Sequence, residues 1–262
     1  MTAPPQDQKK LVQSRFGQAA RAYVTSDIHA RGKDLDRLID MAAPQSDWRI
    51  LDIATGAGHT AFRLAEKGRF VTALDFTWEM IMSAHPNEHT NINFTMGDAE
   101  QLPFANNSFD LVVCRLAAHH FNDCFRFVQE CKRVVKPGAA VLIEDHLNPD
   151  DPRDSNWLDA FERLRDPGHH RAYNRYEWEG MFLDAGLVVD EVEILQLAAG
   201  GVITWAQRQD CTPETIEKLQ IMLAHCPATV ADFIHPSLPG TPHADFIHNF
   251  IFIKGRKPPE GP

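Results

Sequence analysis

The stretch Ile50-Leu51-Asp52-Ile53-Ala54-Thr55-Gly56-Ala57-Gly58-His59-Thr60-Ala61 decides how this chain folds. It begins as an apolar run, passes through a turn of small residues, and continues into a helical pattern that ends at Gly68. This order predicts a strand, a tight glycine turn and a helix. Gly56 and Gly58 allow a ligand to approach the backbone closely, and the helix N-terminus directs free N–H groups toward that ligand.

Outward from this stretch, short apolar runs alternate with helical patterns. The expected strands are 48–53, 70–75, 92–96, 109–115, 139–145 and 187–195, and the expected helices are 60–67, 77–84, 122–135 and 174–185. This alternation predicts an α/β fold with a doubly wound, mostly parallel sheet that is covered by helices on both faces. A last strand at 246–254 ends the folded part. Ligands of such sheets bind at the carboxyl ends of the strands.

The segments outside this alternation are assigned by their length and position. Segments 146–173 and 198–245 both leave from the carboxyl ends of expected strands, so we interpret them as a cap over the active site. Helices are expected within 11–42, where Tyr23 is a candidate to cover a ligand; the alternative is that these helices only pack on the sheet. We expect one domain over 11–254, with flexible tails at 1–10 and 255–262.

Composition excludes several classes of protein. The chain has 262 residues, enough for one α/β domain with a substantial core. Its formal net charge of −10 disfavours nucleic acid or an anionic membrane surface as the main partner. Its five cysteines lack CxxC spacing, and no run of about 18 apolar residues occurs. We therefore expect a cytoplasmic protein without membrane insertion; the oligomeric state, including a homodimer, stays open.

Three carboxylates fall on one edge of the expected sheet. Asp52, Asp75 and Asp98 each lie at or just after the end of a strand, and neighbouring members are 23 residues apart. Asp75 suits the two hydroxyls of a ribose, and Asp98 with Ala99 suits an adenine edge. Asp52 suits a cationic amino group, which it could contact directly or through water. The turn also fits the GxGxxG/A pattern of dinucleotide sites. A nicotinamide site does not require the acid pair Asp98 and Glu100. This pair and the segment 101–115 therefore favour an adenine-bearing ligand other than a nicotinamide dinucleotide.

Residues 48–145 resemble the class I S-adenosylmethionine-dependent methyltransferases, especially the group of the ubiquinone and menaquinone C-methyltransferases. The matching pieces are LDIATGAG, LDFTWEM, GDAEQLPF, SFDLVVCR and RVVKPGAAVLIED. The resemblance implies a seven-stranded sheet whose last strand runs antiparallel. It also implies S-adenosylmethionine as methyl donor and S-adenosylhomocysteine as product.

The resemblance also assigns binding roles by position. The donor-binding turn corresponds to Asp52, Thr55, Gly56 and Gly58, the ribose ligand to Asp75 with Phe76 beside it, the adenine contacts to Asp98 and Ala99, and the methionine contact to Arg115. Two departures are Ala54, where many relatives have glycine, and Trp78, where a small polar residue is common. Pieces around 114–121, 144–146 and 165–169 also resemble a bacterial subgroup of uncharacterised methyltransferases, which leaves the acceptor open.

Methyl transfer to oxygen or to an activated carbon usually needs a base, whereas a neutral amine needs only orientation. Histidine suits this role because its pKa lies near neutrality. His119 and His120, after the fourth strand, and His146, which follows Asp145 after the fifth, are the candidate catalytic residues. All of them fall at the carboxyl edge. The alternative is that these histidines serve only packing or orientation.

The first cap segment contains candidates for binding an anionic or phenolic acceptor, with a solvated loop as the alternative: Arg165, His169, His170, Arg171 and Tyr173. No HExxH or Cys/His spacing is present, so we predict no metal site.

The sequence thus predicts an S-adenosylmethionine-dependent methyltransferase that acts on a small-molecule acceptor. A quinone-like or other aromatic carbon acceptor is our first interpretation, and an N- or O-methylated metabolite is the next. A non-catalytic S-adenosylmethionine-binding or regulatory protein of the same fold is the alternative from another class, and a nicotinamide enzyme ranks third.

Overall fold

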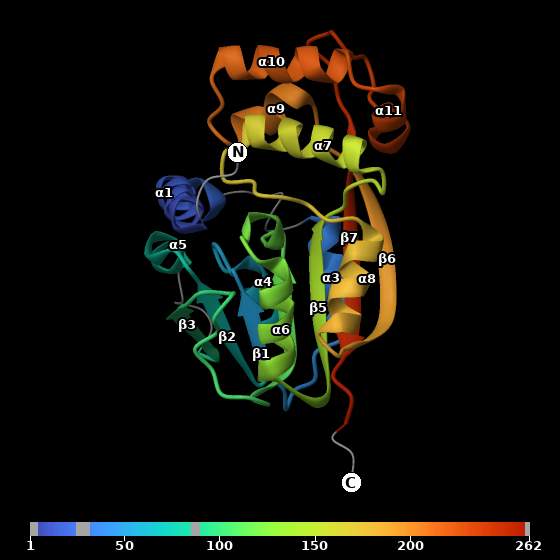
Figure 1. Ribbon diagram of the computed structural model, residues 1–262. Helices are drawn as coiled ribbons and strands as arrows, with labels where there is room; N and C mark the ends of the chain where they lie inside the picture. The colour runs from blue at the N-terminus through green and yellow to red at the C-terminus, as the bar shows by residue number, and fades with distance from the viewer. Residues whose placement is uncertain (1–4, 25–31, 85–89, 260–262) are drawn as a thin grey trace.

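The computed structural model describes residues 5–24, 32–84 and 90–259, without the side chains of 5–7 and 18–24. These residues form a seven-stranded sheet with the order β3-β2-β1-β4-β5-β7-β6 (Figure 1). The strands are β1 (Arg49–Ile53), β2 (Phe70–Asp75), β3 (Ile92–Met96), β4 (Phe109–Arg115), β5 (Val135–His146), β6 (Val188–Ala198) and β7 (Ile247–Arg256). β7 runs antiparallel to both β5 and β6. The predicted sheet with its antiparallel last strand is confirmed.

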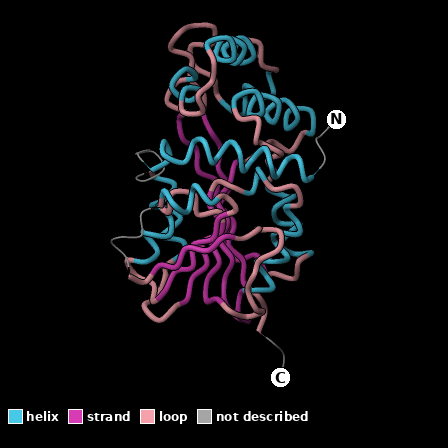
Figure 2. Tube along the Cα trace, turned by 90° about the vertical axis from the view of Figure 1, so that its left-hand side faces the viewer, coloured by secondary structure: helices cyan, strands magenta, loops and turns pink. Residues whose placement is uncertain are grey.

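Helices cover the sheet on both sides, as the turned view in Figure 2 shows. On one face α3 (Lys33–Ala42) and α4 (His59–Ala65) bury Leu38 and Leu64 against β1 and β2. On the other face α6 (Cys124–Val134) and α8 (Arg175–Asp184) bury Phe127, Trp178 and Phe182. Because both faces are buried, the central strands are mostly apolar, which is the usual pattern of a parallel sheet, and their buried carboxylates lie near the carboxyl ends.

Secondary structure extends into both segments that were predicted to be flexible tails. The helix α1 (Pro5–Val24) begins inside the predicted tail 1–10, and it packs on α5 (Trp78–Ser83). Gln8 there donates to the carbonyl of Gly168 at 2.9 Å, a contact that no local pattern predicts. At the other end β7 continues to Arg256, inside the predicted tail 255–262, because Lys257 extends the backbone pairing to Gly138 and Ala139.

The cap is a helical layer above the carboxyl edge of the sheet (Figure 1). It consists of α7 (Pro152–Arg165), α9 (Val202–Gln207), α10 (Pro213–Ala224) and α11 (Ala228–Ile234). These helices share a hydrophobic cluster of their own around Phe161, Trp205 and Phe246. None of the described helices is long and apolar enough to cross a membrane.

Two glycines test the packing of α8 on β7. A Cβ at Gly255 would lie 2.8 Å from the Phe182 ring and 2.9 Å from the Val188 carbonyl oxygen, whereas a Cβ at Gly180 would meet nothing within 4 Å. We expect Gly255→Ala to lower the free energy of unfolding by about 1–3 kcal/mol through overpacking. Gly180→Ala, inside α8, is the matched control and should raise it by about 0.5–1 kcal/mol. Urea unfolding measures both; equal effects of the two substitutions would contradict this packing.

Candidate active site

The turn after β1 forms one wall of a cavity of about 270 Å³ at the carboxyl edge of the sheet. Thr55 and Gly56 line this cavity, and Gly56 adopts a left-handed backbone with φ of 55°. Ala54, where many members of the resembling family have glycine, also has a positive φ of 55°, so glycine would relax the backbone there. Gly58 does not line the cavity. A Cβ at Gly58 would lie 3.1 Å from the Phe62 ring.

Asp75 closes this turn from the end of β2. Its carboxylate accepts hydrogen bonds from the backbone N–H groups of Gly56 and Thr77, both at 2.8 Å. Burial raises the pKa of Asp75, and these N–H donors oppose the rise. Asp75 and Phe76 both line the cavity. The carboxylate therefore fixes the turn and still faces the space where a ligand would lie.

Asp52 lies beneath the turn instead of at its surface. It is 1% exposed, does not line the cavity, and accepts a hydrogen bond from the Thr55 hydroxyl at 2.6 Å. Burial raises the pKa of Asp52 to about 7, although Thr55 and Arg115 oppose the rise. Asp52 supports Thr55, which does reach the cavity, so its predicted role toward a ligand, directly or through water, stays a prediction.

A second, smaller cavity lies beside the first. It is lined by Asp98 and Ala99, which are the predicted adenine contacts, by Phe76, and by Lys9 from α1. Lys9 Nζ is 2.6 Å from Asp98 and 2.7 Å from Glu100. Burial opposes the charge on Lys9, but the two carboxylates raise its pKa above the usual value. Sequence analysis missed Lys9, because it falls in the part expected to be a tail.

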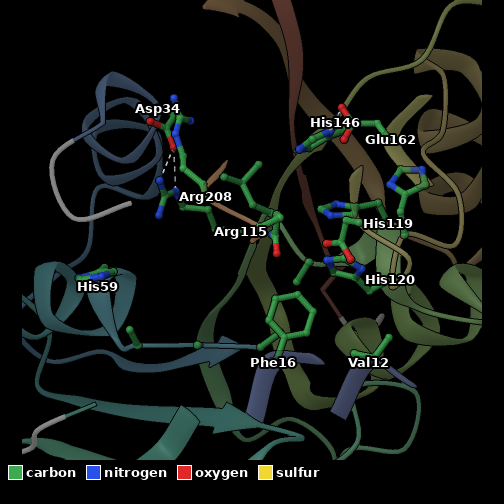
Figure 3. Close-up of a pocket in the computed structure, with 18 of the residues that line it drawn as sticks. Val12, Phe16, Asp34, His59, Arg115, His119, His120, His146, Glu162 and Arg208 are labelled. Carbon is green, nitrogen blue, oxygen red and sulfur yellow. Dashed lines mark hydrogen bonds and ion pairs between the residues drawn. The ribbon is translucent and has the colours of Figure 1, made fainter. Parts of the chain in front are cut away.

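Arg115, at the end of β4, is paired with carboxylates on two sides. It donates to Asp34 from Nε at 3.0 Å and from Nη2, and Glu144 Oε2 lies 3.3 Å from Nε. Asp34 and Arg115 both line the cavity (Figure 3). Sequence analysis missed Asp34, because a contact across 81 positions leaves no local signal. The pair offers one charge of each sign to a ligand.

Among the predicted base candidates, His119 is oriented by two contacts to the Asp145 carboxylate. Its Nδ1 lies 2.5 Å from Asp145 Oδ1, and its backbone N–H donates to Asp145 Oδ2 at 2.9 Å. Because a carboxylate can only accept, Nδ1 carries the hydrogen and Nε2 keeps a lone pair. Nε2 has no hydrogen-bond partner within the described residues. Burial lowers the pKa of His119 well below its usual range, and His120 and His169 lower it further.

The other histidines at the cavity interact with different groups of the protein. His120 Nδ1 donates to the Gly168 carbonyl at 2.9 Å, and His169 Nε2 hydrogen-bonds to Asp159 at 2.8 Å. His146 and His248 face Glu162 instead, on the same side of the cavity as His119 (Figure 3 shows His146, Glu162 and His119). Burial lowers the pKa of His146 well below its usual range and that of His248 to about 3. Burial raises the pKa of Glu162.

The acceptor candidates from the first cap segment divide into two groups. Arg165 and His169 line the cavity, and Arg165 lies over the Trp205 ring at 4.4 Å. His170, Arg171 and Tyr173 do not line it. Arg171 pairs with Glu177, and Tyr173 packs on Trp178. The Tyr23 side chain lies outside the described residues. Trp205, Arg208 and Phe250 complete the cavity wall and were not singled out as ligand contacts from sequence.

Comparison with known proteins defines the class. Residues 51–143 match the family described as Methyltransferase domain. The chain is 37% identical over 182 residues to the uncharacterized methyltransferase YcgJ of Bacillus subtilis, covering 68% of this chain and 72% of that protein. The chain belongs to the class I S-adenosylmethionine-dependent methyltransferases, and S-adenosylmethionine is its methyl donor.

The relatives differ in what their names say of function. The crystal structure of YcgJ matches this fold with a TM-score of 0.82 and 32% identity, covering 87% of this chain and 99% of that one. A demethylmenaquinone methyltransferase from Renibacterium salmoninarum is 32% identical over 142 residues, which is 53% of this chain and 60% of that protein. A phosphoethanolamine N-methyltransferase from Haemonchus contortus, solved with S-adenosyl-L-methionine, shares the fold at 18% identity and a TM-score of 0.63, covering 98% of this chain and 60% of that one.

Asp75 gives a direct test of the donor site. We expect Asp75→Asn to weaken S-adenosylhomocysteine binding about 10- to 100-fold, because a hydrogen bond to a charged group contributes about 1.5–3 kcal/mol. Calorimetric titration measures the affinity, and thermal melting checks that the variant folds. Asp110→Asn is the control, since Asp110 contacts Arg49 and Lys136 and lines neither cavity. Unchanged affinity in Asp75→Asn would place the donor elsewhere.

Proposed function

We propose that this protein transfers the methyl group of S-adenosylmethionine to a small aromatic acceptor of quinol type, on oxygen or on an activated ring carbon. The observation that supports this most strongly is the pair His119 and Asp145. A base held by a carboxylate, with its other nitrogen open to a cavity, is needed for an acceptor that must lose a proton. An amine that reacts in its neutral form has no such requirement.

In this proposal the donor lies along the carboxyl edge of the sheet. Asp75 accepts hydrogen bonds from the ribose hydroxyls, and the adenine enters the second cavity between Phe76, Asp98 and Ala99. Arg115 and Asp34 bind the carboxylate and ammonium groups of the methionine part, because they present opposite charges 3.0 Å apart at the cavity wall. Thr55 and Gly56 contact the donor from the turn.

The reaction then follows from the positions of donor and base. The acceptor oxygen or carbon attacks the sulfonium methyl group in line, the carbon–sulfur bond breaks, and S-adenosylhomocysteine leaves as a neutral thioether. The acceptor's hydroxyl proton moves to His119 Nε2. Burial, which lowers the pKa of His119, opposes the imidazolium, and the Asp145 carboxylate, which keeps its three donors throughout, stabilises it. His120 and His146 line the same cavity and orient the acceptor.

Flat apolar walls favour an aromatic ring in the acceptor space. Trp205 and Phe250 line it from the cap and from β7, and Phe16 lines it from α1. Arg165, stacked on Trp205, supplies a positive charge near a developing phenolate. The demethylmenaquinone methyltransferase among the relatives acts, by its name, on such a ring. The cap segments 146–173 and 198–245 exclude water from this space.

His119 provides the test of the proposed base. We expect His119→Gln to lower kcat about 100- to 10,000-fold, the usual contribution of a general base, with S-adenosylhomocysteine affinity changed less than about threefold. The assay follows transfer of the radiolabelled donor methyl group to a panel of quinols, naphthols and catechols, beside a panel of amines. His225→Gln, outside both cavities, is the control.

The two panels and the variant separate the outcomes. Labelled quinol products that disappear in His119→Gln support both the acceptor class and the base. Near-normal kcat in His119→Gln removes His119 as base. Label found only in amines contradicts the aromatic acceptor.

A further inference from the structure

Six histidines line the large cavity, and hydrogen bonding divides the five that lie outside the donor turn. His119, His120 and His169 are each held by a protein acceptor, namely Asp145, the Gly168 carbonyl and Asp159. His146 and His248 make no side-chain hydrogen bond to any described residue. These two imidazoles are the ones that face the Glu162 carboxylate. His119, His120 and His169 are therefore held in fixed orientations, whereas both ring nitrogens of His146 and His248 are available to a ligand.

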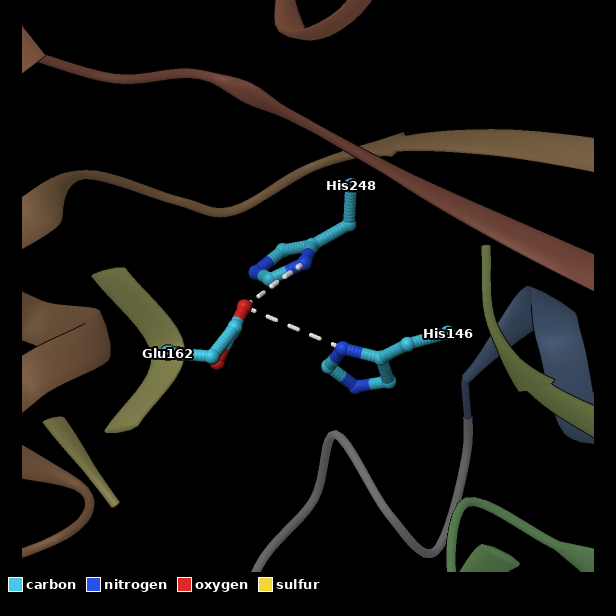
Figure 4. A group of neighbouring side chains, drawn as sticks. All are labelled: His146, Glu162 and His248. Carbon is cyan, nitrogen blue, oxygen red and sulfur yellow. Dashed lines mark ion pairs between the residues drawn. The ribbon is translucent and has the colours of Figure 1, made fainter. Parts of the chain in front are cut away.

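The pair and Glu162 converge from three elements (Figure 4). His146 ends β5 and is paired in register with Phe250 of β7. His248 lies two residues before Phe250, so both side chains leave the same face of the sheet. Glu162 comes from the last turn of α7 in the cap. Its Oε1 is 3.7 Å from His146 Nδ1 and 3.9 Å from His248 Nδ1, and one ligand atom from each residue lies within 4.8 Å of the others.

Glu162 is a buried carboxylate without a hydrogen-bond donor. It is 6% exposed and lines the cavity, and no described residue donates a hydrogen bond to its side chain. Arg165 Nη1 is 3.8 Å from Oε2, but Arg165 stacks on Trp205 and donates from Nε to the Trp205 carbonyl at 3.1 Å. Burying a carboxylate without donors costs several kcal/mol. A cation at Oε1 would offset that cost.

We propose that His146, Glu162 and His248 bind a divalent transition-metal ion in the acceptor cavity. Two imidazole nitrogens and one carboxylate oxygen suit Zn²⁺, Fe²⁺, Co²⁺ or Mn²⁺, whereas Mg²⁺ and Ca²⁺ prefer oxygen ligands throughout. Bonds of about 2.0–2.2 Å place atoms that share one ion about 3–4 Å apart. The two distances to Glu162 already fall in this range, so small side-chain rotations complete the site.

Three protein ligands leave coordination positions open toward the cavity. An oxygen of the acceptor can occupy one of them, and a hydroxyl bound to a metal ion loses its proton more readily. The ion would then orient the acceptor and lower the demand on His119. This use of the ion rests on the proposed function, but the binding site does not. Sequence spacing gave no sign of the site, because its ligands come from β5, α7 and β7.

Metal binding can be measured without donor or acceptor. The full chain is stripped with a chelator, titrated with Co²⁺ and followed by visible absorption, and Zn²⁺ is then added in competition. We expect one Co²⁺ per chain, with ligand-field bands that Zn²⁺ abolishes. Glu162→Gln and His248→Ala should each weaken binding about 100-fold or more. Circular dichroism and thermal melting check the fold of each variant.

Two histidine variants serve as matched controls. His119→Gln removes a neighbouring cavity imidazole, 4.5 Å from His146 between ring centroids, and should keep Co²⁺ binding. His225→Ala removes a histidine outside both cavities and should also keep it. The proposal is overturned if the wild-type chain binds neither metal. It is also overturned if folded His248→Ala binds Co²⁺ as the wild type does, or if His119→Gln abolishes binding. Metal binding without methyl transfer would leave this site standing and overturn the proposed function alone.

Discussion

The histidine-lined side of the cavity, which we propose binds the acceptor, depends on one buried carboxylate, Asp145. It accepts hydrogen bonds from the backbone N–H of His119, from the His119 ring and from the backbone N–H of His146. These contacts tie the loop after β4 to the end of β5, which are neighbouring strands in the sheet. A buried carboxylate is tolerated when its acceptor positions are satisfied, so each contact stabilises the others. Loss of Asp145 would release both the ring of His119 and the loop that carries it.

The site combines two kinds of support. The proposed donor side consists of the ends of β1, β2 and β4, where backbone geometry and the carboxylates of Asp75 and Asp52 fix the turn. The acceptor side is completed by α7, α9 and β7, which bring Glu162, Trp205 and His248 to the cavity. The core of the cap is separate from the two cores that flank the sheet. Acceptor choice can therefore differ between relatives while the donor turn stays the same.

Local patterns were sufficient for the fold and for which of the proposed donor-binding residues reach a cavity. Strands β2, β3 and β4 follow the predicted bounds, because short apolar runs between turn residues specify buried strands. Thr55, Gly56, Asp75, Phe76 and Arg115 line the large cavity, and Asp98 and Ala99 line the smaller one, since parallel strands bring their carboxyl ends to one edge. Asp52 and Gly58 line neither cavity and instead hydrogen-bond to Thr55. Sequence spacing does not distinguish such supporting residues from those that line the cavity.

The residues that sequence missed are those placed by long-range packing. Asp34 reaches Arg115 from α3, Lys9 reaches Asp98 from α1, and Glu162 reaches the strand histidines from α7. The hydrophobic periodicity of a single helix or strand does not predict such contacts between elements. His248 left a weak signal, because it alternates with Phe250 in β7 and with Phe246 just before that strand, and the three aromatic rings lie next to one another.

A crystal structure of the protein with S-adenosylhomocysteine and a quinol tests the central claim most directly. Our account predicts the ribose at Asp75, the sulfur facing the histidine-lined cavity, and the quinol hydroxyl within hydrogen-bond distance of His119 Nε2, with Nδ1 still on Asp145. A complex in which another side chain separates the quinol from His119, or in which the sulfur faces away from this cavity, would contradict it.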